Sequence, residues 1–342
     1  MRAAYFSEHG GPEVMEVGER PDPEPADHEV RIEVEAFALN HLDLWVRRGL
    51  PGLDLELPHV GGSDVAGRID ATGDGVEGWD VGERVVLNPG LWCGDCEWCA
   101  AGEHSLCDEY GILGEHMDGG AAELVVAPAR NLYRLPEGFP AEEAAAVPLV
   151  FQTAWRALIG RAGLRAGESV LVTGASGGVS TAAIQIARLA GARVFAVTSG
   201  PESVRRAEEL GAHEAIDRLE EDFSEAVWRA TDRRGVDVVL DSVGEAVWEG
   251  CVRALAKGGR LVTYGATTGP EGKLDIRRMF WKQIQVMGST MASHAQFREA
   301  MDQVFRGPLE PVVDEVFPMD EIEAAHRRLE EGGQFGKVVL TP

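Results

Sequence analysis

Residues 170–180 read Val-Leu-Val-Thr-Gly-Ala-Ser-Gly-Gly-Val-Ser and are the most informative stretch of the chain. An apolar run typical of a buried strand passes into a glycine-rich turn that opens a helix. Backbone amides at such a turn can hold a pyrophosphate, because small residues permit close approach. The glycine pattern is degenerate, since Ala175 and Ser180 stand at its first and third positions. A tight strand-to-helix turn without a ligand is therefore the alternative interpretation.

The turn lies within a regular alternation of helices and strands that begins near residue 141. A second strand follows at the distance that a strand-helix-strand unit needs, and two further units come after it. The expected helices cover residues 141–162, 179–190, 204–210 and 247–256, and the expected strands cover 169–173, 192–198, 236–241 and 260–264. This order predicts an α/β fold with a parallel, doubly wound sheet.

The remainder of the chain has a different pattern. The first 120 residues are β-rich, with short alternating apolar runs such as residues 30–34, and a last strand is expected at residues 336–340. The 342 residues exceed the about 250 to 300 that one hydrophobic core usually serves. We therefore expect two domains.

Composition excludes several classes of function. The chain has 32 basic and 57 acidic side chains and a net charge of −25, so we expect it to bind neither nucleic acid nor a membrane surface. No apolar stretch approaches the ~18 residues of a membrane span. Glu8 and His9 interrupt the region where an export signal needs its apolar run, so we expect a cytoplasmic enzyme. Only four basic residues are lysines, a bias that we interpret as a surface property.

Four of the five cysteines lie close together in the sequence. Cys93, Cys96, Cys99 and Cys107 are spaced C-x2-C-x2-C-x7-C. Four thiolates from one short loop satisfy tetrahedral zinc, and a closed site of this kind folds a lobe without offering a position to substrate. An iron–sulfur cluster and unrelated thiols are the alternatives. Cys251, isolated in an alanine-rich segment, is expected to be a small buried hydrophobe.

The choice between nicotinamide cofactors depends on the end of the second strand. An acidic residue there would bind the ribose hydroxyls of NAD and repel the 2′-phosphate of NADP. The sequence has Thr198 and Ser199 at this point, and Arg205 or Arg206 can pair with a phosphate one turn later. Glu202 lies nearby and opposes this effect, and the arginines have a solvated helix face as their alternative role. We expect NADP(H), with NAD(H) possible.

A further signature points to a family. Residues 62–67, Gly-Ser-Asp-Val-Ala-Gly, continue to Gly73 and Val76 and resemble the G-H-E-x2-G-x5-G-x2-V signature of zinc-containing alcohol dehydrogenases. Together with the cysteines and the glycine turn, the whole chain resembles a medium-chain dehydrogenase/reductase. The resemblance implies a GroES-like catalytic domain at residues 1–140 with a structural zinc lobe at 93–107, a Rossmann domain at 141–270, and a return to the first domain within 271–342. It also implies that the four cysteines hold structural zinc, and that the protein is a homodimer or homotetramer.

The sequence departs from the zinc-dependent members at the catalytic metal. The resemblance places Asn40, Ser63 and Leu149 where those members have their Cys, His and Cys ligands. None of these three side chains binds zinc well, so we expect no catalytic zinc. The chain is instead similar to the quinone-oxidoreductase branch, which passes hydride from NADPH to a conjugated carbonyl. That branch commonly lacks the cysteine lobe, so the chain combines features of both groups.

Four polar residues are the candidates for catalysis. Asn40 can donate a hydrogen bond to the acceptor oxygen, with Asp43 and Ser63 nearby, and His41 or a water held by Asp43 can deliver the proton. Each residue also has an ordinary alternative role, as a turn residue, a helix cap or a surface side chain. Asp64 matches the family's Glu beside the metal and can brace the loop.

The cofactor is expected to contact residues of several strand ends. Thr153 matches the family's threonine near the nicotinamide, and other positions border the strand ends or the glycine turn. The candidates are Thr153, Gly174, Ala175, Gly177, Gly178, Val179, Thr198, Ser199, Arg205, Asp241, Gly265, Ala266 and Thr267. Trp45, Phe280 and Trp281 are expected in the core or, alternatively, in an apolar substrate pocket.

Three functions follow from these patterns. The first is an NADPH-dependent reductase of quinones or α,β-unsaturated carbonyls without catalytic zinc. The second is an alcohol dehydrogenase with an atypical zinc site, for which the local donors are His41, His59, Asp43 and Asp64. The third is a dinucleotide-binding sensor that performs no turnover.

Overall fold

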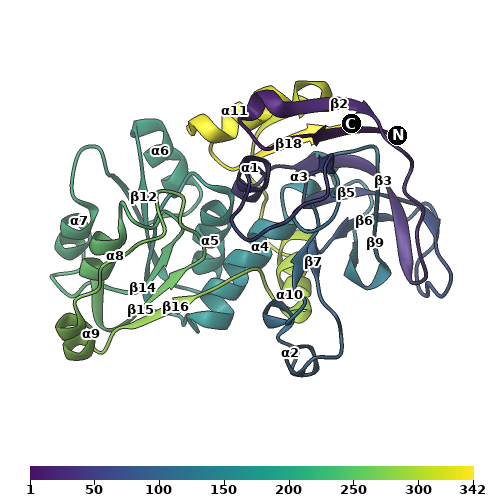
Figure 1. Ribbon diagram of the computed structural model, residues 1–342. Coiled ribbons are helices and arrows are strands. Elements are labelled where there is room, and N and C mark those ends of the chain that lie inside the picture. Colours follow the sequence, from purple (N-terminus) through teal and green to yellow (C-terminus); the bar gives the residue numbers. More distant parts are fainter. The chain divides into compact units, whose positions relative to one another are not determined.

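The computed structural model describes residues 1–342 and contains two compact units (Figure 1). Unit 1 comprises Met1–Val150 and Ala292–Pro342, and unit 2 comprises Phe151–Met291. The chain therefore enters unit 2 some ten residues after the boundary expected at 140, and it returns to unit 1 at residue 292, within the segment 271–342.

Unit 2 is built on a six-stranded parallel sheet. Its strand order is β13-β12-β11-β14-β15-β16, and every neighbouring pair is parallel. From β11 the chain adds β12 and β13 on one side, and it then crosses to the other side of β11 and adds β14, β15 and β16. This is the doubly wound topology. The strands are β11 (Ser169–Val172), β12 (Arg193–Thr198), β13 (Glu214–Asp217), β14 (Val236–Asp241), β15 (Leu255–Thr263) and β16 (Gln285–Gly288). The predicted fold class is confirmed.

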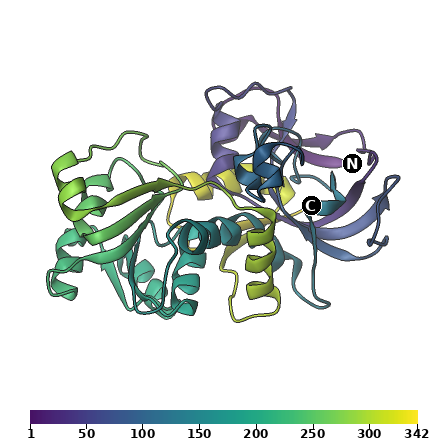
Figure 2. The ribbon, with the colours of Figure 1, turned by 90° about the horizontal axis from the view of Figure 1, so that it is seen from below.

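Helices cover both faces of this sheet, as Figures 1 and 2 show. Since both faces are covered, the strands are apolar without alternation, and residues such as Leu171, Val239 and Leu261 are fully buried. The helices of unit 2 are α5 (Gly178–Leu189), α6 (Pro201–Glu209), α7 (Phe223–Ala230), α8 (Trp248–Ala254) and α9 (Ile276–Lys282). Cys251 of α8 is fully buried, as predicted.

Unit 1 is dominated by a seven-stranded sheet. Its strands follow the order β10-β6-β5-β3-β18-β17, and β9 pairs with β3. They are β3 (Glu29–Ala38), β5 (Asp64–Thr72), β6 (Arg84–Leu87), β9 (Leu124–Pro128), β10 (Leu132–Arg134), β17 (Val313–Pro318) and β18 (Lys337–Thr341). The C-terminal strand β18 lies between β17 and β3, so the end of the chain forms an interior strand of this sheet.

Two small sheets and five helices complete unit 1. The small sheets consist of β1 (Arg2–Phe6), β2 (Met15–Glu19) and β4 (His59–Val60), and of β7 (Gly90–Leu91) and β8 (Gly111–Ile112). The helices are α1 (His41–Arg48), α2 (Glu97–Ala100), α3 (Ala141–Ala145), α10 (His294–Phe305) and α11 (Ile322–Glu331). Ile32 and Phe37 of β3 and Leu340 of β18 are fully buried in one core.

The helix expected over residues 141–162 is divided in the structure. It consists of α3, α4 (Pro148–Trp155) and a π-helical turn over Arg156–Arg161. Pro148 accounts for the first division, because proline has no N–H to donate and disfavours helical conformation in the residue before it.

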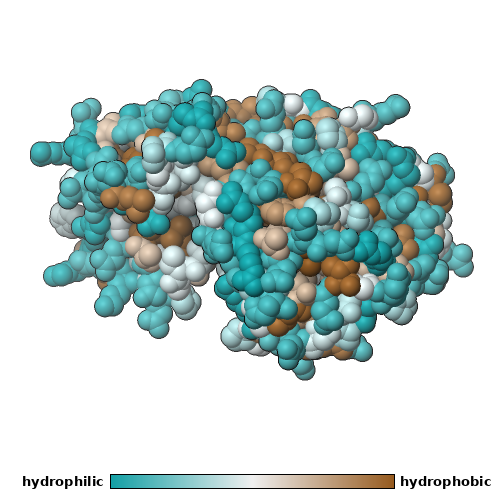
Figure 3. Space-filling view, turned by 90° about the horizontal axis from the view of Figure 1, so that it is seen from above, coloured by the Kyte–Doolittle hydropathy of each residue, from teal (hydrophilic) through white to brown (hydrophobic).

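None of the helices is long and apolar enough to cross a membrane. The face shown in Figure 3 is mostly hydrophilic, with apolar residues in separate patches.

Candidate active site

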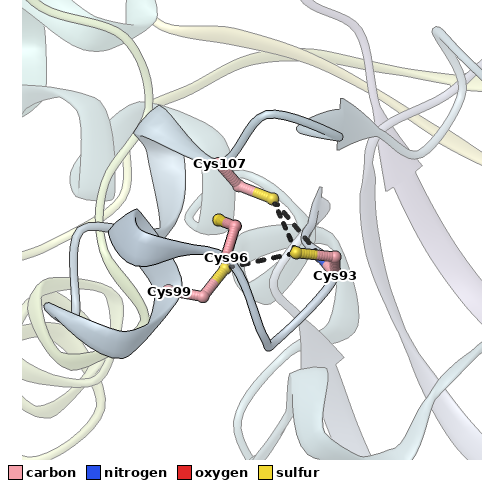
Figure 4. Close-up of side chains that lie close together, drawn as sticks. All are labelled: Cys93, Cys96, Cys99 and Cys107. Atoms are coloured by element: carbon pink, nitrogen blue, oxygen red, sulfur yellow. Dashed lines mark hydrogen bonds between the residues drawn. The ribbon is translucent and has the colours of Figure 1, made fainter.

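The four clustered cysteines converge in a lobe of unit 1 (Figure 4). They lie around the short helix α2, and their sulfur atoms are all within 4.8 Å of one another. The Cys107 and Cys93 sulfurs are 3.4 Å apart, and those of Cys93 and Cys99 are 3.9 Å apart. All four thiols are free.

This donor set fits a structural zinc ion. Zinc bound tetrahedrally at about 2.3 Å from each sulfur separates the sulfurs by about 3.8 Å, close to the shorter distances found. Since four protein sulfurs would complete the coordination, the metal would hold the lobe together and would not bind substrate. These four cysteines are the one group of three or more His, Cys, Asp or Glu side chains that lie close enough together to hold a metal ion.

A second cluster in unit 1 joins Asn40, Asp64 and Lys337 (the polar cluster). The Lys337 Nζ donates to Asn40 Oδ1 at 2.6 Å and to Asp64 Oδ2 at 2.7 Å. The Asn40 Nδ2 donates to the same Asp64 oxygen at 2.9 Å, and Asp64 Oδ1 accepts the backbone N–H of Leu149 at 2.7 Å. The Asp64 carboxylate is fully buried, and Lys337 is only 4% exposed.

The polar cluster joins segments from four parts of the chain. Asn40 precedes α1, Asp64 begins β5, Leu149 lies in α4, and Lys337 begins β18. Sequence reasoning identified the first three positions and missed Lys337. The sequence signal for Lys337 was that it is one of only four lysines and lies in the expected last strand. The interpretation of the lysines as surface residues is therefore wrong for Lys337.

The Asp43 carboxylate binds the backbone at Asn40 and at Gly62, two residues before Asp64. One of its oxygens accepts the N–H of Asn40 at 2.7 Å, and the other accepts the N–H of Gly62 at 2.9 Å. Burial is the main cause that raises the pKa of Asp43 to about 6, opposed by these two hydrogen bonds. Because both oxygens bind backbone, the geometry favours a positioning role for Asp43 over direct proton transfer.

Ser63 and His41 complete the candidate residues of unit 1. The Ser63 hydroxyl is fully buried and has no hydrogen-bond partner within the protein. Buried polar atoms without a partner are rare, and they often indicate a water or ligand position. Burial lowers the pKa of His41, as do the positive charges of Lys337 and Arg48. The imidazole is therefore neutral at pH 7.

The glycine turn of unit 2 joins β11 to α5. Gly174 has a φ of +56°, the left-handed region that favours glycine. Gly177 precedes the helix and offers no side chain to its first amides. The amides of Ala175 and Gly177 already donate to backbone carbonyls. The amides at the start of α5, among them those of Gly178 and Val179, remain as donors for a pyrophosphate.

The loops after β14 and β15 are held together at the same edge of the sheet. Both oxygens of Asp241 accept N–H groups of its own loop, from Val243 at 3.2 Å and Gly244 at 3.0 Å. The Thr267 N–H then donates to the Ser242 carbonyl at 3.1 Å. These bonds shape the loop that includes Gly265 and Ala266, so Asp241 has a structural role at this edge of the sheet.

An acid that the sequence did not single out, Asp217, lies beside the end of β12. Thr198 pairs in register with Asp217, the last residue of the neighbouring strand β13. Asp217 Oδ2 accepts the N–H of Gly200 at 3.0 Å, directly after Ser199. On α6, Arg205 is bound by Glu202 at 2.6 Å and by Glu209. Its positive charge is therefore largely balanced within the helix.

The three aromatic residues singled out in the sequence occupy different environments. Phe280 and Trp281 of α9 are 64% and 77% exposed, so the expectation of core packing is wrong for both. Their helix is short and its apolar side chains are not covered by unit 2. Trp45 is half-buried, with its ring 6.5 Å from that of His41. Thr153 is buried, and its hydroxyl contacts the Met291 sulfur at 3.9 Å.

Two family models match the chain. Residues 26–137 match "Alcohol dehydrogenase GroES-like domain", and residues 178–306 match "Zinc-binding dehydrogenase". Among curated proteins, the chain is 31% identical to the quinone oxidoreductase of Homo sapiens, over 99% of this chain and 97% of that protein. It is 33% identical to the acryloyl-coenzyme A reductase of Metallosphaera sedula, over 95% and 96%. A crystal structure described as NAD-dependent alcohol dehydrogenase has 48% identity and a TM-score of 0.97, with both chains fully covered.

Proposed function

The chain belongs to the medium-chain dehydrogenase/reductase superfamily and is an NAD(P)-dependent oxidoreductase, and from this premise we propose that it reduces quinones or α,β-unsaturated carbonyls with NADPH and without a catalytic zinc. The observation that carries the proposal is the polar cluster. At the positions of the missing metal ligands, Leu149 offers no side-chain donor, and the Asn40 oxygen accepts a lysine ammonium. A cation that binds this oxygen competes directly with any metal ion.

The alternative zinc site would need His41, His59, Asp43 and Asp64, and all of these except His41 are already engaged. The Asp43 oxygens bind two backbone amides, and those of Asp64 bind Leu149 and Lys337. The His59 Nε2 contacts the Gly114 carbonyl at 3.1 Å. The residues present therefore do not fit a second zinc ion, and no step of the reaction is assigned to one.

The residues of unit 2 fit a nicotinamide dinucleotide. The amides of Gly178 and Val179 at the start of α5 would bind the pyrophosphate, and the loops after β14 and β15 would border the rest of the cofactor. When bound, the reduced nicotinamide supplies a hydride. The protein must then orient the acceptor and stabilise the negative charge that develops on its oxygen.

In unit 1, we assign the stabilisation of this negative charge to Asn40, whose amide nitrogen can donate to the acceptor oxygen. Ser63 offers a further hydroxyl without a protein partner. His41, being neutral, would relay a proton from solvent and not act as a stored imidazolium. Asp43 holds the backbone of Asn40 and Gly62 in place.

For the cofactor, we propose a modest preference for NADPH over NADH. Thr198 and Ser199 leave room for a 2′-phosphate, and Arg205 can approach it. The preference is modest because Glu202 and Glu209 already bind Arg205, and because the Asp217 carboxylate lies at the same edge. Both carboxylates beside Arg205 would also repel the phosphate.

The relatives help to define the class of acceptor. The chain resembles a quinone oxidoreductase and an acryloyl-coenzyme A reductase to similar degrees. Quinones and acryloyl thioesters share a carbon–carbon double bond conjugated to a carbonyl group. We propose this conjugated system as the feature that the site recognises.

Alcohol oxidation is the second candidate function, because the structure with 48% identity is described as NAD-dependent alcohol dehydrogenase. The two candidates are separated by one experiment. NADPH or NADH oxidation is followed with a quinone, an enone and an enoyl thioester, and NAD(P)⁺ reduction is followed with primary and secondary alcohols. Faster turnover of the conjugated acceptors, unchanged by a chelator, supports the proposal. Turnover of alcohols alone, abolished by the chelator, contradicts it.

The protein is also proposed to form a homodimer or homotetramer and to act in the cytoplasm. Strand β16 is the edge of the sheet in unit 2, and exposed edge strands are usually covered in native proteins. Helix α9 precedes this strand and exposes Ile276, Phe280 and Trp281. A second copy that covers both features would explain their exposure in the single chain.

A further inference from the structure

The buried ammonium of Lys337 needs an explanation beyond folding. Burying an ion pair such as Lys337 and Asp64 costs desolvation that its attraction only partly recovers, and apolar residues of similar size are often as stable. Breaking such a pair is nevertheless costly, so both charges must be kept or lost together. Retention of a lysine in this place, in a chain with only four, suggests a use for its charge.

The contacts of Lys337 fix the orientation of the Asn40 side chain. An ammonium has only donors and a carboxylate has only acceptors. The Asn40 atom that faces Lys337 must therefore be the oxygen, and the atom that faces Asp64 must be the nitrogen. A flipped amide would place donor against donor and acceptor against acceptor. Lys337 and Asp64 together thus hold the Asn40 nitrogen in one defined direction.

Two donors of the polar cluster remain without a protein acceptor. Lys337 Nζ has three N–H groups, and two of them bind Asn40 and Asp64. Asn40 Nδ2 has two N–H groups, and one of them binds Asp64. The Ser63 hydroxyl, next to Asp64 in the sequence, is also buried and has no partner in the protein. Buried N–H groups without an acceptor in the protein indicate that a ligand or water binds them.

We propose that the remaining N–H groups of Lys337 and Asn40 bind the carbonyl oxygen of the acceptor and stabilise its negative charge during hydride transfer. This inference rests on the proposed function and deepens it, because it assigns to a lysine the stabilisation of negative charge that a metal ion would otherwise provide. In an enone or an enoyl thioester, hydride from the reduced cofactor adds to the β-carbon, and the π electrons move to the oxygen to give an enolate. A proton from solvent then reaches the α-carbon, which leaves the saturated carbonyl compound and the oxidised cofactor. A quinone takes up the same hydride and proton and becomes a hydroquinone.

The first test compares Lys337→Met with Lys337→Arg. The methionine removes the charge and the donors at similar length, whereas the arginine keeps both. We expect kcat to fall by roughly 100-fold in Lys337→Met and to recover partly in Lys337→Arg, with an unchanged dissociation constant for NADPH. Lys282→Met is the matched control, because Lys282 also donates to a buried acceptor, the Leu255 carbonyl at 2.6 Å. It should lose stability without losing kcat.

A double variant separates catalysis from folding. Lys337→Met alone leaves the Asp64 charge unpaired and should unfold at a lower temperature. Lys337→Met with Asp64→Leu removes both charges, so we expect its unfolding midpoint to return toward that of the wild type while kcat stays low. Recovery of kcat together with stability would overturn the inference, since Lys337 would then only neutralise Asp64.

The remaining outcomes are also decisive. A raised NADPH dissociation constant with unchanged kcat in Lys337→Met would mean that the lysine binds the cofactor, and the inference would be wrong. If the wild type reduces aldehydes and no conjugated acceptor, the proposed substrate class fails, and the same variants then test Lys337 on the aldehyde oxygen. If the wild type reduces no carbonyl compound of either kind, both the proposed function and the inference fail.

Discussion

At the scale of single residues, the candidate site shows how hydrogen-bond partners determine the role of a buried side chain. Asp43 and Asp64 are both buried carboxylates, yet one binds two backbone amides and the other binds a lysine. Sequence reasoning named both residues as site candidates but could not distinguish these roles. The partner that defines Asp64 lies 273 residues away in the chain.

The pKa of Asp43 predicts a dependence of stability on pH. Burial raises this pKa from 3.8 to about 6, so the folded protein holds the proton more tightly than the unfolded chain. The contribution of Asp43 to the unfolding free energy should therefore fall by about 3 kcal/mol as pH rises from about 4 to 6, and should stay constant above that. The difference in unfolding free energy between the wild type and Asp43→Asn, measured at several pH values, isolates this titration. A difference that does not vary between pH 4 and 6 would contradict it.

Cofactor preference can be tested at Arg205. Arg205→Ala should weaken NADPH binding by about 10-fold and leave NADH binding unchanged, because a charge-assisted hydrogen bond to the 2′-phosphate is lost. Glu202→Gln should have the opposite effect, since it frees the guanidinium and removes a repulsive charge. Arg229→Ala serves as control, because Arg229 is exposed and paired with Glu221 elsewhere in unit 2. Equal effects of Arg205→Ala on both cofactors would exclude a role in phosphate recognition.

At the scale of elements, helices α1 and α11 adjoin the segments that carry Asn40 and Lys337 of the polar cluster. Arg47 at the end of α1 is fully buried and contacts His326 at 2.8 Å and Glu330, both on α11. Helix α1 begins directly after Asn40, and α11 precedes the strand that begins with Lys337. Burial is the main cause that lowers the pKa of His326 to about 3, so its ring is neutral and can accept from Arg47.

Loss of this contact should destabilise unit 1. Arg47→Ala is expected to cost about 3 to 5 kcal/mol of unfolding free energy, because it breaks a buried network. Arg48→Ala is the matched control, since Arg48 binds the same Glu330 from an exposed position and should cost at most about 1 kcal/mol. Denaturant unfolding measures both, and similar costs for the two variants would show that burial of Arg47 contributes nothing.

The cysteine lobe is a separate element with its own test. Cys107→Ser should remove zinc from the protein and lower the unfolding free energy by about 4 kcal/mol, if free zinc stands at about 1,000 times its dissociation constant for the wild type. NADPH binding by unit 2 should be retained. Cys251→Ala is the control for metal content, because Cys251 lies in α8, away from the cluster. Zinc retention in Cys107→Ser would exclude the four-cysteine site.

At the scale of the whole molecule, the edge strand β16 and the exposed helix α9 predict self-association. Phe280→Glu with Trp281→Glu should convert the oligomer to a monomer, because two charges would be placed against an apolar surface. Leu219→Glu is the control, since Leu219 is 67% exposed but lies outside α9. Light scattering gives the mass of each variant. An unchanged mass for the α9 variant would place the interface elsewhere.

Much of the architecture could be predicted from local sequence patterns. The strand and turn at residues 170–180 and the alternation after residue 141 predicted the parallel sheet, and the cysteine spacing predicted the lobe. The polar cluster could not be predicted in this way, because Lys337 and Asn40 are 297 residues apart and meet only when β18 pairs with β3. Asp217 was missed for a similar reason, since it reaches the end of β12 from the neighbouring strand.

The amount of zinc bound per chain tests whether the site works without a catalytic metal. Elemental mass spectrometry on purified, dialysed protein gives this value without any choice of substrate. One zinc ion per chain is the predicted result, because the four cysteines form one closed site and the polar cluster offers a lysine in place of metal ligands. Two zinc ions per chain would contradict a site without catalytic metal and would make alcohols and aldehydes the first substrates to examine.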